Sequence, residues 1–100
     1  MQTIIMIYRL NKGVSIEEYK RFSLEIDQPF VKSFDSIIDF SVNIIEGPQK
    51  EWDVFEVMKI NSYKDWEKIS ETEEMKKHVI EWVKYANEGS VKLFYGNKIE

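Results

Sequence analysis

The sequence has no cysteine, few residues that break regular structure and no excess of basic charge. It contains four glycines and two prolines, and its fourteen Lys and Arg are interspersed with eighteen Asp and Glu. Without cysteine, disulfides, thiolate catalysis and cysteine-ligated metals are excluded. A net charge of −4 without a basic stripe argues against nucleic-acid binding. The apolar run at residues 4–7 is too short to span a membrane and follows no basic leader, so we expect a cytoplasmic protein with no membrane segment.

What the sequence does contain is enough apolar surface for a small core. Of its 100 residues, 43% are hydrophobic and 14% are aromatic. A chain of this length supports one core rather than two. We therefore expect residues 1–100 to form a single domain.

Four segments have the pattern of β-strands. Residues 52–60 are rich in β-branched and aromatic side chains and contain no Gly or Pro, which is typical of a strand with one face on a core. Residues 3–10 and 90–97 are also expected to form strands, and residues 47–50 are expected to form a hairpin turn. Residues 37–46 alternate between polar and apolar, and their expected apolar face consists of Ile38, Phe40, Val42 and Ile44.

Helical patterns lie between these strands. Ser15, followed three residues later by Glu18, has the spacing of a capping box, and apolar side chains then recur at helical intervals. Pro29 lies inside this pattern and lacks a backbone donor, so we expect the helix to kink or restart around residues 27–29 and to end near residue 34.

Two more helices are expected before the last strand. The first covers residues 62–69 with Ser62 as its cap. The second starts at residues 71–73, runs to about residue 87 and is ended by Gly89.

The order of these elements, βαββαβ, predicts an α+β, ferredoxin-like fold. In this fold a four-stranded antiparallel sheet carries its helices on one face. The other face would leave large apolar side chains in water unless something covers it. A second copy of the chain would provide that cover, so we expect a homodimer with a barrel-like interior. The side chains assigned to this interior are Ile4, Met6, Tyr8, Trp52, Met58 and Phe94.

Short motifs spread over nearly the whole chain suggest a family. They are Ile7-Tyr8-Arg9-Leu10, Gly13-Val14-Ser15, Glu17-Glu18-Tyr19, Asp27-Gln28-Pro29, Phe40-Ser41-Val42, Val54-Phe55-Glu56-Val57 and Glu74-Met75. Together they resemble the dimeric α/β-barrel superfamily and, within it, the RedY-like group of HapK-type proteins from prodiginine and related pyrrole pathways. The resemblance implies a dimer whose interior cavity receives a small aromatic or heteroaromatic metabolite. Members of this superfamily carry out diverse chemistry, often without metal or cofactor, so the fold does not define the reaction.

Glu56 is the first candidate for chemistry, because it lies in the middle of the most strand-like segment, between Phe55 and Val57. In a pocket, apolar neighbours would raise the pKa of its carboxyl group and suit it to acid or base catalysis. The alternative is a carboxylate that points to solvent or pairs with a lysine.

Asp27, Gln28 and His78 are candidates of a second kind. A helix disturbed by Pro29 leaves backbone groups unpaired, and Asp27 and Gln28 would then orient a ligand or simply cap the irregular turn. The similarity to EthD-type proteins, which carry polar residues before the same proline, favours a pocket role. His78 is the only histidine. Histidine is a common acid–base residue, although a flank position on its helix is the commoner outcome, and no metal-ligand spacing accompanies it.

Tyr8, Asn43 and Trp52 would line the same interior under this assignment of faces. Aromatic walls with a few polar groups are typical of sites for ring-shaped ligands. The alternative for Tyr8 and Trp52 is ordinary packing at the dimer interface.

We therefore expect a small-molecule-binding protein of secondary metabolism that assists condensation or rearrangement of an aromatic intermediate without a cofactor. Glu56 and Asp27 would transfer protons. Two alternatives remain open: a non-catalytic carrier of such an intermediate, and a cofactor-free monooxygenase of the antibiotic-biosynthesis type. The sequence does not identify the substrate.

Overall fold

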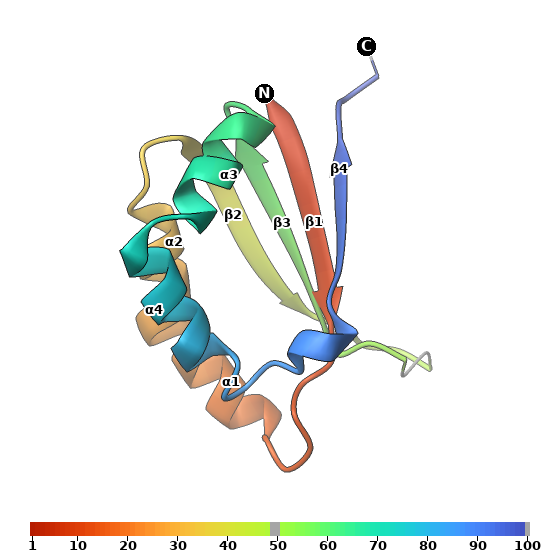
Figure 1. Cartoon of the computed structure of the whole chain (residues 1–100). Coiled ribbons are helices and arrows are strands. Elements are labelled where there is room, and N and C mark those ends of the chain that lie inside the picture. Colours follow the sequence, from red (N-terminus) through yellow and green to blue (C-terminus); the bar gives the residue numbers. More distant parts are fainter. Residues whose placement is uncertain (49–50, 100) are drawn as a thin grey trace.

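The computed structural model describes residues 1–48 and 51–99. The strands form one antiparallel sheet in the order β2-β3-β1-β4, and the α-helices all lie over one face of it (Figure 1). The predicted α+β, ferredoxin-like arrangement is confirmed. The elements in chain order are β1 (Gln2–Tyr8), α1 (Ile16–Phe22), the π-helix η1 (Ser23–Asp27), α2 (Gln28–Lys32), β2 (Ile37–Ile44), β3 (Val54–Ile60), α3 (Tyr63–Ser70), α4 (Glu73–Trp82), the 3-10 helix η2 (Glu88–Ser90) and β4 (Lys92–Gly96).

The even-numbered side chains of β1 and β3 face the helices. Ile4 pairs with Met58 and Tyr8 pairs with Val54, and each of these four residues is at most 5% exposed. The prediction that Ile4, Met6, Tyr8 and Met58 lie on the open face is therefore wrong. Successive side chains of a strand alternate between faces, so assigning the wrong face to one residue reverses every other assignment in the strand.

The open face of the sheet carries an apolar stripe that crosses three strands. Ile5 of β1 pairs with Val57 on one side and with Phe94 on the other, and Ile7 pairs with Phe55. Ile5, Phe55 and Phe94 are 38%, 36% and 52% exposed. Phe94 thus lies on the open face, as predicted, and a stripe of this kind is typical of a surface that another protein covers.

The first helical segment runs without a break but widens before Pro29. The backbone N–H of Gln28 donates to the carbonyl of Ser23, five residues earlier, which defines a π-type turn. A wide turn suits this position because Pro29 has no N–H to donate and its ring would crowd a regular α-turn. The predicted irregularity is present: a π-helix covers Ser23–Asp27, the α-helix restarts at Gln28, and the segment ends at Lys32 rather than near residue 34. The π-helix holds Asp27 in the interior, 3% exposed.

A β-bulge at the start of β2 decides which isoleucine is buried. Ile37 and Asp39 pair with consecutive residues of β3, so Ile38 has no partner in the register. Ile37 is 8% exposed and Ile38 is 53% exposed. The prediction that Ile38 shares the apolar face of Phe40 is wrong, because the extra residue interrupts the alternation.

The hairpin after β2 follows the prediction as far as it is described. Gly47 has a φ of +107°, a left-handed conformation that glycine adopts without strain and that suits a turn. Residues 49 and 50 of the predicted turn lie outside the described residues. Trp52 precedes β3, which begins at Val54 rather than at residue 52.

The C-terminal part keeps the predicted order with shorter elements. Ser62 caps α3 by accepting a hydrogen bond from the N–H of Asp65, as predicted. The last helix, α4, ends at Trp82 rather than near residue 87, because the chain beyond it pairs with the segment after β1 through a bridge between Leu10 and Ala86. None of the helices in residues 1–48 and 51–99 is long and apolar enough to cross a bilayer.

Candidate functional site

A cavity of about 150 Å³ lies between the sheet and the helices. Its walls come from the three strands β1, β2 and β3 on one side and from η1, α2, α3 and α4 on the other. Most of the lining is apolar and includes Met6, Trp66 and Trp82. Three ionisable side chains also line it: Asp27, Glu56 and His78. A mostly apolar cavity with a few converging polar groups is the usual form of a small-molecule site.

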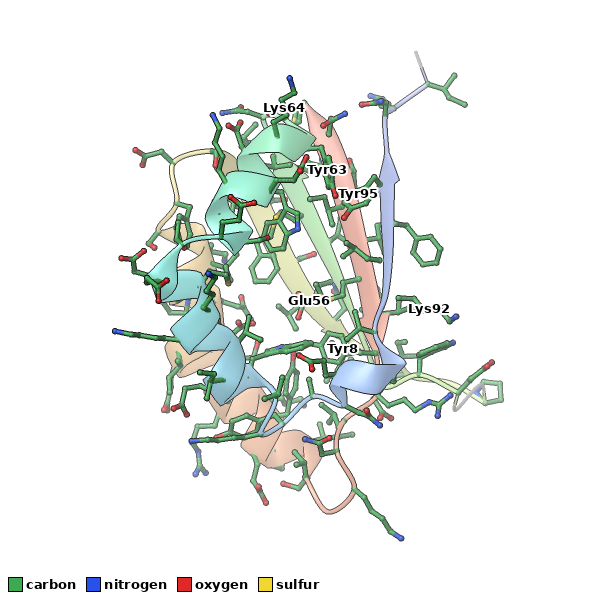
Figure 2. The ribbon with its side chains drawn as sticks, viewed as in Figure 1. Tyr8, Glu56, Tyr63, Lys64, Lys92 and Tyr95 are labelled. Carbon is green, nitrogen blue, oxygen red and sulfur yellow. The ribbon has the colours of Figure 1, made fainter. Side chains whose placement is uncertain are left out.

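Glu56 enters this cavity from the centre of β3. Figure 2 shows Glu56 and Tyr8 on the side of the sheet that faces the helices, whereas Lys92 points away from it. The hydroxyl group of Tyr8 donates a 2.5 Å hydrogen bond to Oε2 of Glu56. Since that bond uses the only proton of the hydroxyl group, Tyr19 is the donor in the second contact of Tyr8, hydroxyl to hydroxyl. A buried chain of polar groups therefore runs from Tyr19 on α1 through Tyr8 to Glu56.

The environment of Glu56 favours its protonated form. Burial is the main cause, and the negative charge of Asp27 adds to it; together they raise the pKa of Glu56 to about 8, although the hydrogen bond from Tyr8 opposes the shift. Burial also raises the pKa values of Tyr8 and Tyr19 above their ordinary range. At neutral pH the hydrogen-bonded series of Tyr19, Tyr8 and Glu56 thus consists of two neutral hydroxyl groups and a mainly neutral carboxyl group.

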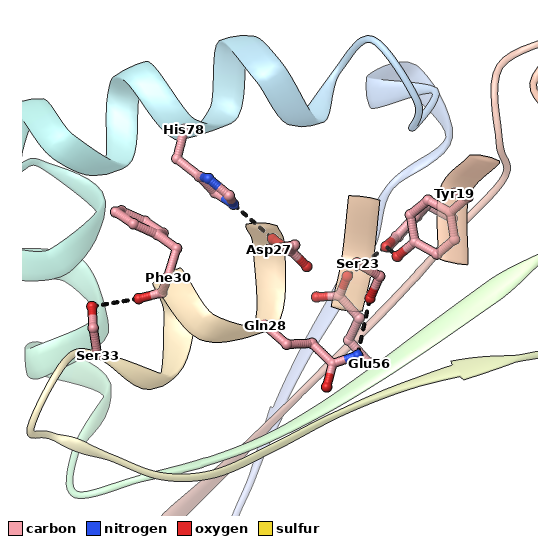
Figure 3. A network of polar contacts seen from close by, with 9 residues as sticks. Tyr19, Ser23, Asp27, Gln28, Phe30, Ser33, Glu56 and His78 are labelled. Atoms are coloured by element: carbon pink, nitrogen blue, oxygen red, sulfur yellow. Dashed lines mark hydrogen bonds and ion pairs between the residues drawn. The ribbon is translucent and has the colours of Figure 1, made fainter. Parts of the chain in front are cut away.

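Asp27 and His78 form a buried pair on the opposite wall. Nε2 of His78 lies 2.6 Å from Oδ1 of Asp27, and their side chains are 8% and 4% exposed. Figure 3 shows the contact, with the second oxygen of Asp27 turned away from His78 on the side of Glu56. This oxygen, Oδ2, is buried and has no hydrogen-bond partner among the described residues. An unpaired buried carboxylate oxygen is costly, which makes it a candidate contact for a ligand.

Aromatic rings hold the imidazole of His78 in place. The ring of Phe30 stacks on it at a centroid distance of 4.3 Å and an interplanar angle of 21°. The ring of Phe22 is also nearly parallel to it, at 6.1 Å and 15°. Stacking restricts rotation of the imidazole and keeps Nε2 directed at Asp27.

The structure brings four of the predicted site residues together and leaves three elsewhere. Asp27, Glu56 and His78 line the cavity, and Tyr8 contacts Glu56 directly. Gln28 instead donates from Nε2 to the hydroxyl of Ser23, 3.1 Å away.

Asn43 and Trp52 lie outside this cavity, contrary to the predicted common interior. Asn43 pairs with Phe55 and so belongs to the open face of the sheet, where its Nδ2 donates to the backbone carbonyl of Phe55. Trp52 lies near two cations instead, with the Arg9 guanidinium 5.2 Å and the Lys92 ammonium 6.0 Å from its ring centre. The reason is that the sequence predicts the interior on the open face, where Asn43 does lie, whereas Tyr8 and the cavity lie on the helix-covered face.

Sequence reasoning missed the role of Tyr19 and of two tryptophans. Tyr19 fits the helical stripe of α1 and looks like a core residue, and its position next to Tyr8 depends on packing between distant segments. Trp66 and Trp82 also fit helical stripes, yet both line the cavity. Among the described residues, no group of three His, Asp or Glu side chains is arranged to hold a metal ion.

The fold and the cavity define a small ferredoxin-like protein with buried acidic groups between its sheet and its helices. The chain belongs to the family described as REDY-like protein HapK, which matches residues 2–99. This confirms the resemblance seen in the sequence motifs. A comparison with curated protein sequences found no match.

Solved structures with the same fold include HapK from Hahella chejuensis, with a TM-score of 0.84 and 20% identity over 99% of this chain and 93% of that chain. An EthD family protein from Bacillus halodurans has a TM-score of 0.75 and 16% identity, with 99% of each chain covered. A dimeric ferredoxin-like protein of unknown function from Bacteroides fragilis has a TM-score of 0.73 and 15% identity over 97% of this chain and 95% of that chain. At these identities the likeness establishes the fold alone.

Proposed function

We propose that this protein binds a small aromatic or heteroaromatic molecule in the cavity between sheet and helices and transfers protons on it. The observation that carries this proposal is the presence of two buried carboxyl groups, Glu56 and Asp27, in a largely apolar cavity. Such groups are costly to bury, and perturbed carboxyl groups of this kind cluster at functional sites.

The two carboxyl groups have different environments and therefore different roles. Glu56, with its raised pKa, holds a proton at neutral pH and serves as the general acid. Asp27 faces the only histidine and serves as the base through Oδ2, while Nε2 of His78 hydrogen-bonds Oδ1. In a rearrangement, Asp27 removes one proton from the ligand and Glu56 delivers another, so the ligand keeps its atoms. In a condensation, Glu56 protonates the carbonyl oxygen while Asp27 takes a proton from the attacking group, which gives a hydroxyl adduct. Asp27 then returns its proton to that hydroxyl, which leaves as water, and Glu56 takes the second proton of the attacking group as the new double bond forms.

The substrate class follows from the family rather than from the geometry. Membership of the REDY-like HapK family supports a role in secondary metabolism, and we propose a pyrrole-type intermediate of a prodiginine-like pathway as the substrate. An electron-rich ring of this kind supplies its own reactivity, so the proposed reaction uses no cofactor.

We further propose that the working form is a homodimer closed over the open face of the sheet. The apolar stripe of Ile5, Ile7, Phe55, Val57 and Phe94 supports this assembly, as does the dimeric description of the Bacteroides fragilis neighbour.

The test is a titration with pyrrole and its methyl derivatives, read out by tryptophan fluorescence, because Trp66 and Trp82 line the cavity. Glu56→Gln removes the transferable proton but preserves shape, so it should bind these compounds and lose turnover of a pathway intermediate. Glu25→Gln, at an exposed site, is the matched control. Turnover that survives Glu56→Gln would contradict the role of Glu56, and turnover that stops without oxygen would indicate a monooxygenase. Binding without any turnover in the unsubstituted protein would identify a carrier.

A further inference from the structure

Two carboxyl oxygens of the cavity wall form no hydrogen bond to a described residue: one belongs to Asp27 and the other to Glu56. Oδ2 of Asp27 is buried and has no hydrogen-bond partner in the described part of the chain. In Glu56 the hydrogen bond from Tyr8 goes to Oε2, which leaves Oε1 for the cavity. Both side chains line the same space.

The partners of these two residues decide which oxygen accepts and which donates. Asp27 is hydrogen-bonded through Oδ1 to His78, and its free oxygen is an acceptor. In the protonated form of Glu56, Oε2 accepts from Tyr8, so the carboxyl proton lies on Oε1 and is available to a ligand. The wall therefore presents one acceptor and one donor to the same ligand.

The size and polarity of the remaining wall restrict the ligand further. A cavity of about 150 Å³ has room for one ring with small substituents rather than for a chain of several rings. Apart from His78 and from Ser70, whose hydroxyl donates to the backbone carbonyl of Trp66, the remaining lining residues are apolar. An anionic ligand would have to lose its hydration there without a counter-charge, and beside the carboxyl groups of Asp27 and Glu56.

We propose that the cavity selects compact ring compounds without negative charge that carry a hydrogen-bond donor and an acceptor on one edge, as lactams and 2-pyridones do. The ring N–H donates to Oδ2 of Asp27, and the ring carbonyl accepts from Oε1 of Glu56. This selectivity rests on the proposed binding function of the cavity, and it narrows the ligand from any small aromatic molecule to one with a paired polar edge.

Affinity for such a ligand depends on pH through Glu56. The titratable groups that face Glu56 are Tyr8 from β1, Tyr19 from α1, Asp27 from η1 and, through Asp27, His78 from α4. Ionisation of Glu56 replaces the donor by a second acceptor, which repels a ring carbonyl. Binding therefore weakens as the pH rises past the pKa of Glu56, about 8.

The experiment compares two isomeric probes, 3-methyl-2-pyridone and 1-methyl-2-pyridone, by NMR titration of the full chain. The isomers have the same atoms, but only the first has a free N–H. We expect the N–H isomer to bind at least about tenfold more tightly at pH 6.5, the ratio typical of a hydrogen bond to a charged group. Asp27→Asn should reduce this ratio to less than about threefold. In Glu56→Gln the side-chain amide still donates a hydrogen bond but does not ionise. This variant should bind the N–H isomer at pH 6.5 as tightly as the unsubstituted protein does, and its affinity should not fall at pH 9.

Toluene, which has no polar edge, separates failure of this inference from failure of the proposed binding function. Equal affinity for the two isomers in the unsubstituted protein, with cavity resonances shifted by all three probes, would overturn the paired-edge selectivity while leaving cavity binding intact. If no probe, toluene included, shifts the resonances of Trp66 or Trp82, the binding function and the selectivity are both wrong.

Discussion

At the scale of single residues, the buried carboxyl group of Glu56 makes stability depend on pH in a direction opposite to that of most acids. Its pKa in the folded protein is about 8, above the ordinary value of 4.5. Between these pH values the unfolded chain releases the proton and the folded protein keeps it, so the free energy of unfolding falls as pH rises. The stabilisation that the protonated carboxyl group of Glu56 contributes to the folded state is fully present below pH 4.5, and it is lost above pH 8.

Glu56→Gln should therefore flatten the pH profile of stability. We expect the unsubstituted protein to lose up to about 1.4 kcal/mol per pH unit between pH 5 and 8 relative to this variant, because a one-unit shift in pKa corresponds to that free energy. Urea denaturation across this pH range measures the difference. Glu25→Gln, at an exposed position of η1, should show the profile of the unsubstituted protein. Parallel profiles for the protein and Glu56→Gln would mean that Glu56 is ionised at neutral pH.

Tyr8→Phe removes the hydroxyl that joins Tyr19 to Glu56. We expect a loss of about 1–3 kcal/mol in the free energy of unfolding, because two buried polar groups lose a partner. The pKa of Glu56 should rise further, since the hydrogen bond from Tyr8 now lowers it. Urea denaturation and NMR titration of labelled glutamate carboxyl groups measure the two effects. Tyr85→Phe removes a hydroxyl with no hydrogen bond to a described residue, and an equal loss there would contradict the role of the Tyr8 hydroxyl.

At the scale of elements, the cap of α4 supports the site because this helix carries His78. Thr72 accepts a hydrogen bond from the N–H of Met75 and donates one to the carbonyl of Ile69. Thr72→Ala should reduce the free energy of unfolding by about 1 kcal/mol, the usual contribution of an N-cap. Thr72→Ser, which keeps the hydroxyl, should lose much less. Urea denaturation measures both, and equal losses would show that the methyl group of Thr72, rather than the cap, is responsible.

The elements also show what the sequence could and could not predict. Their order and both serine caps, Ser15 and Ser62, follow from patterns within a few residues, and these predictions hold. The π-helix and the β-bulge at Ile38 do not, since each adds one residue to a regular period for reasons that lie in the surrounding structure. The end of α4 depends on pairing with Leu10, far away in the sequence, and no local pattern signals it.

At the scale of the whole molecule, the open face predicts self-association. Phe94→Glu places a charge in the apolar stripe, and we expect it to convert a dimer into a monomer in sedimentation equilibrium. Ile80→Glu is the control, because Ile80 is an exposed residue of α4, 62% accessible, on the helix layer rather than the open face. A mass that is the same for Phe94→Glu and the unsubstituted protein would place the contact elsewhere or exclude the dimer.

The candidate site could also be predicted only in part from the sequence. Asp27, Glu56 and His78 were each identifiable as candidates from the sequence, because an acid inside an apolar strand, an acid beside a helical proline and a lone histidine are unusual. Their meeting in one cavity could not be derived, since Asp27 and His78 are 51 residues apart and the face that each strand turns to the helices is ambiguous in an alternating pattern. For the same reason the sequence predicts an interior on the open face that Tyr8 shares with Asn43 and Trp52, whereas Tyr8 lies on the helix-covered face.

The stacked setting of His78 gives the protein a built-in spectroscopic reporter. It is the only histidine in the chain, so a proton spectrum contains a single pair of imidazole carbon-bound resonances. The ring of Phe30, 4.3 Å away and nearly parallel, shifts these resonances upfield through its ring current. A molecule that enters the cavity and displaces either ring would move one isolated, easily assigned signal.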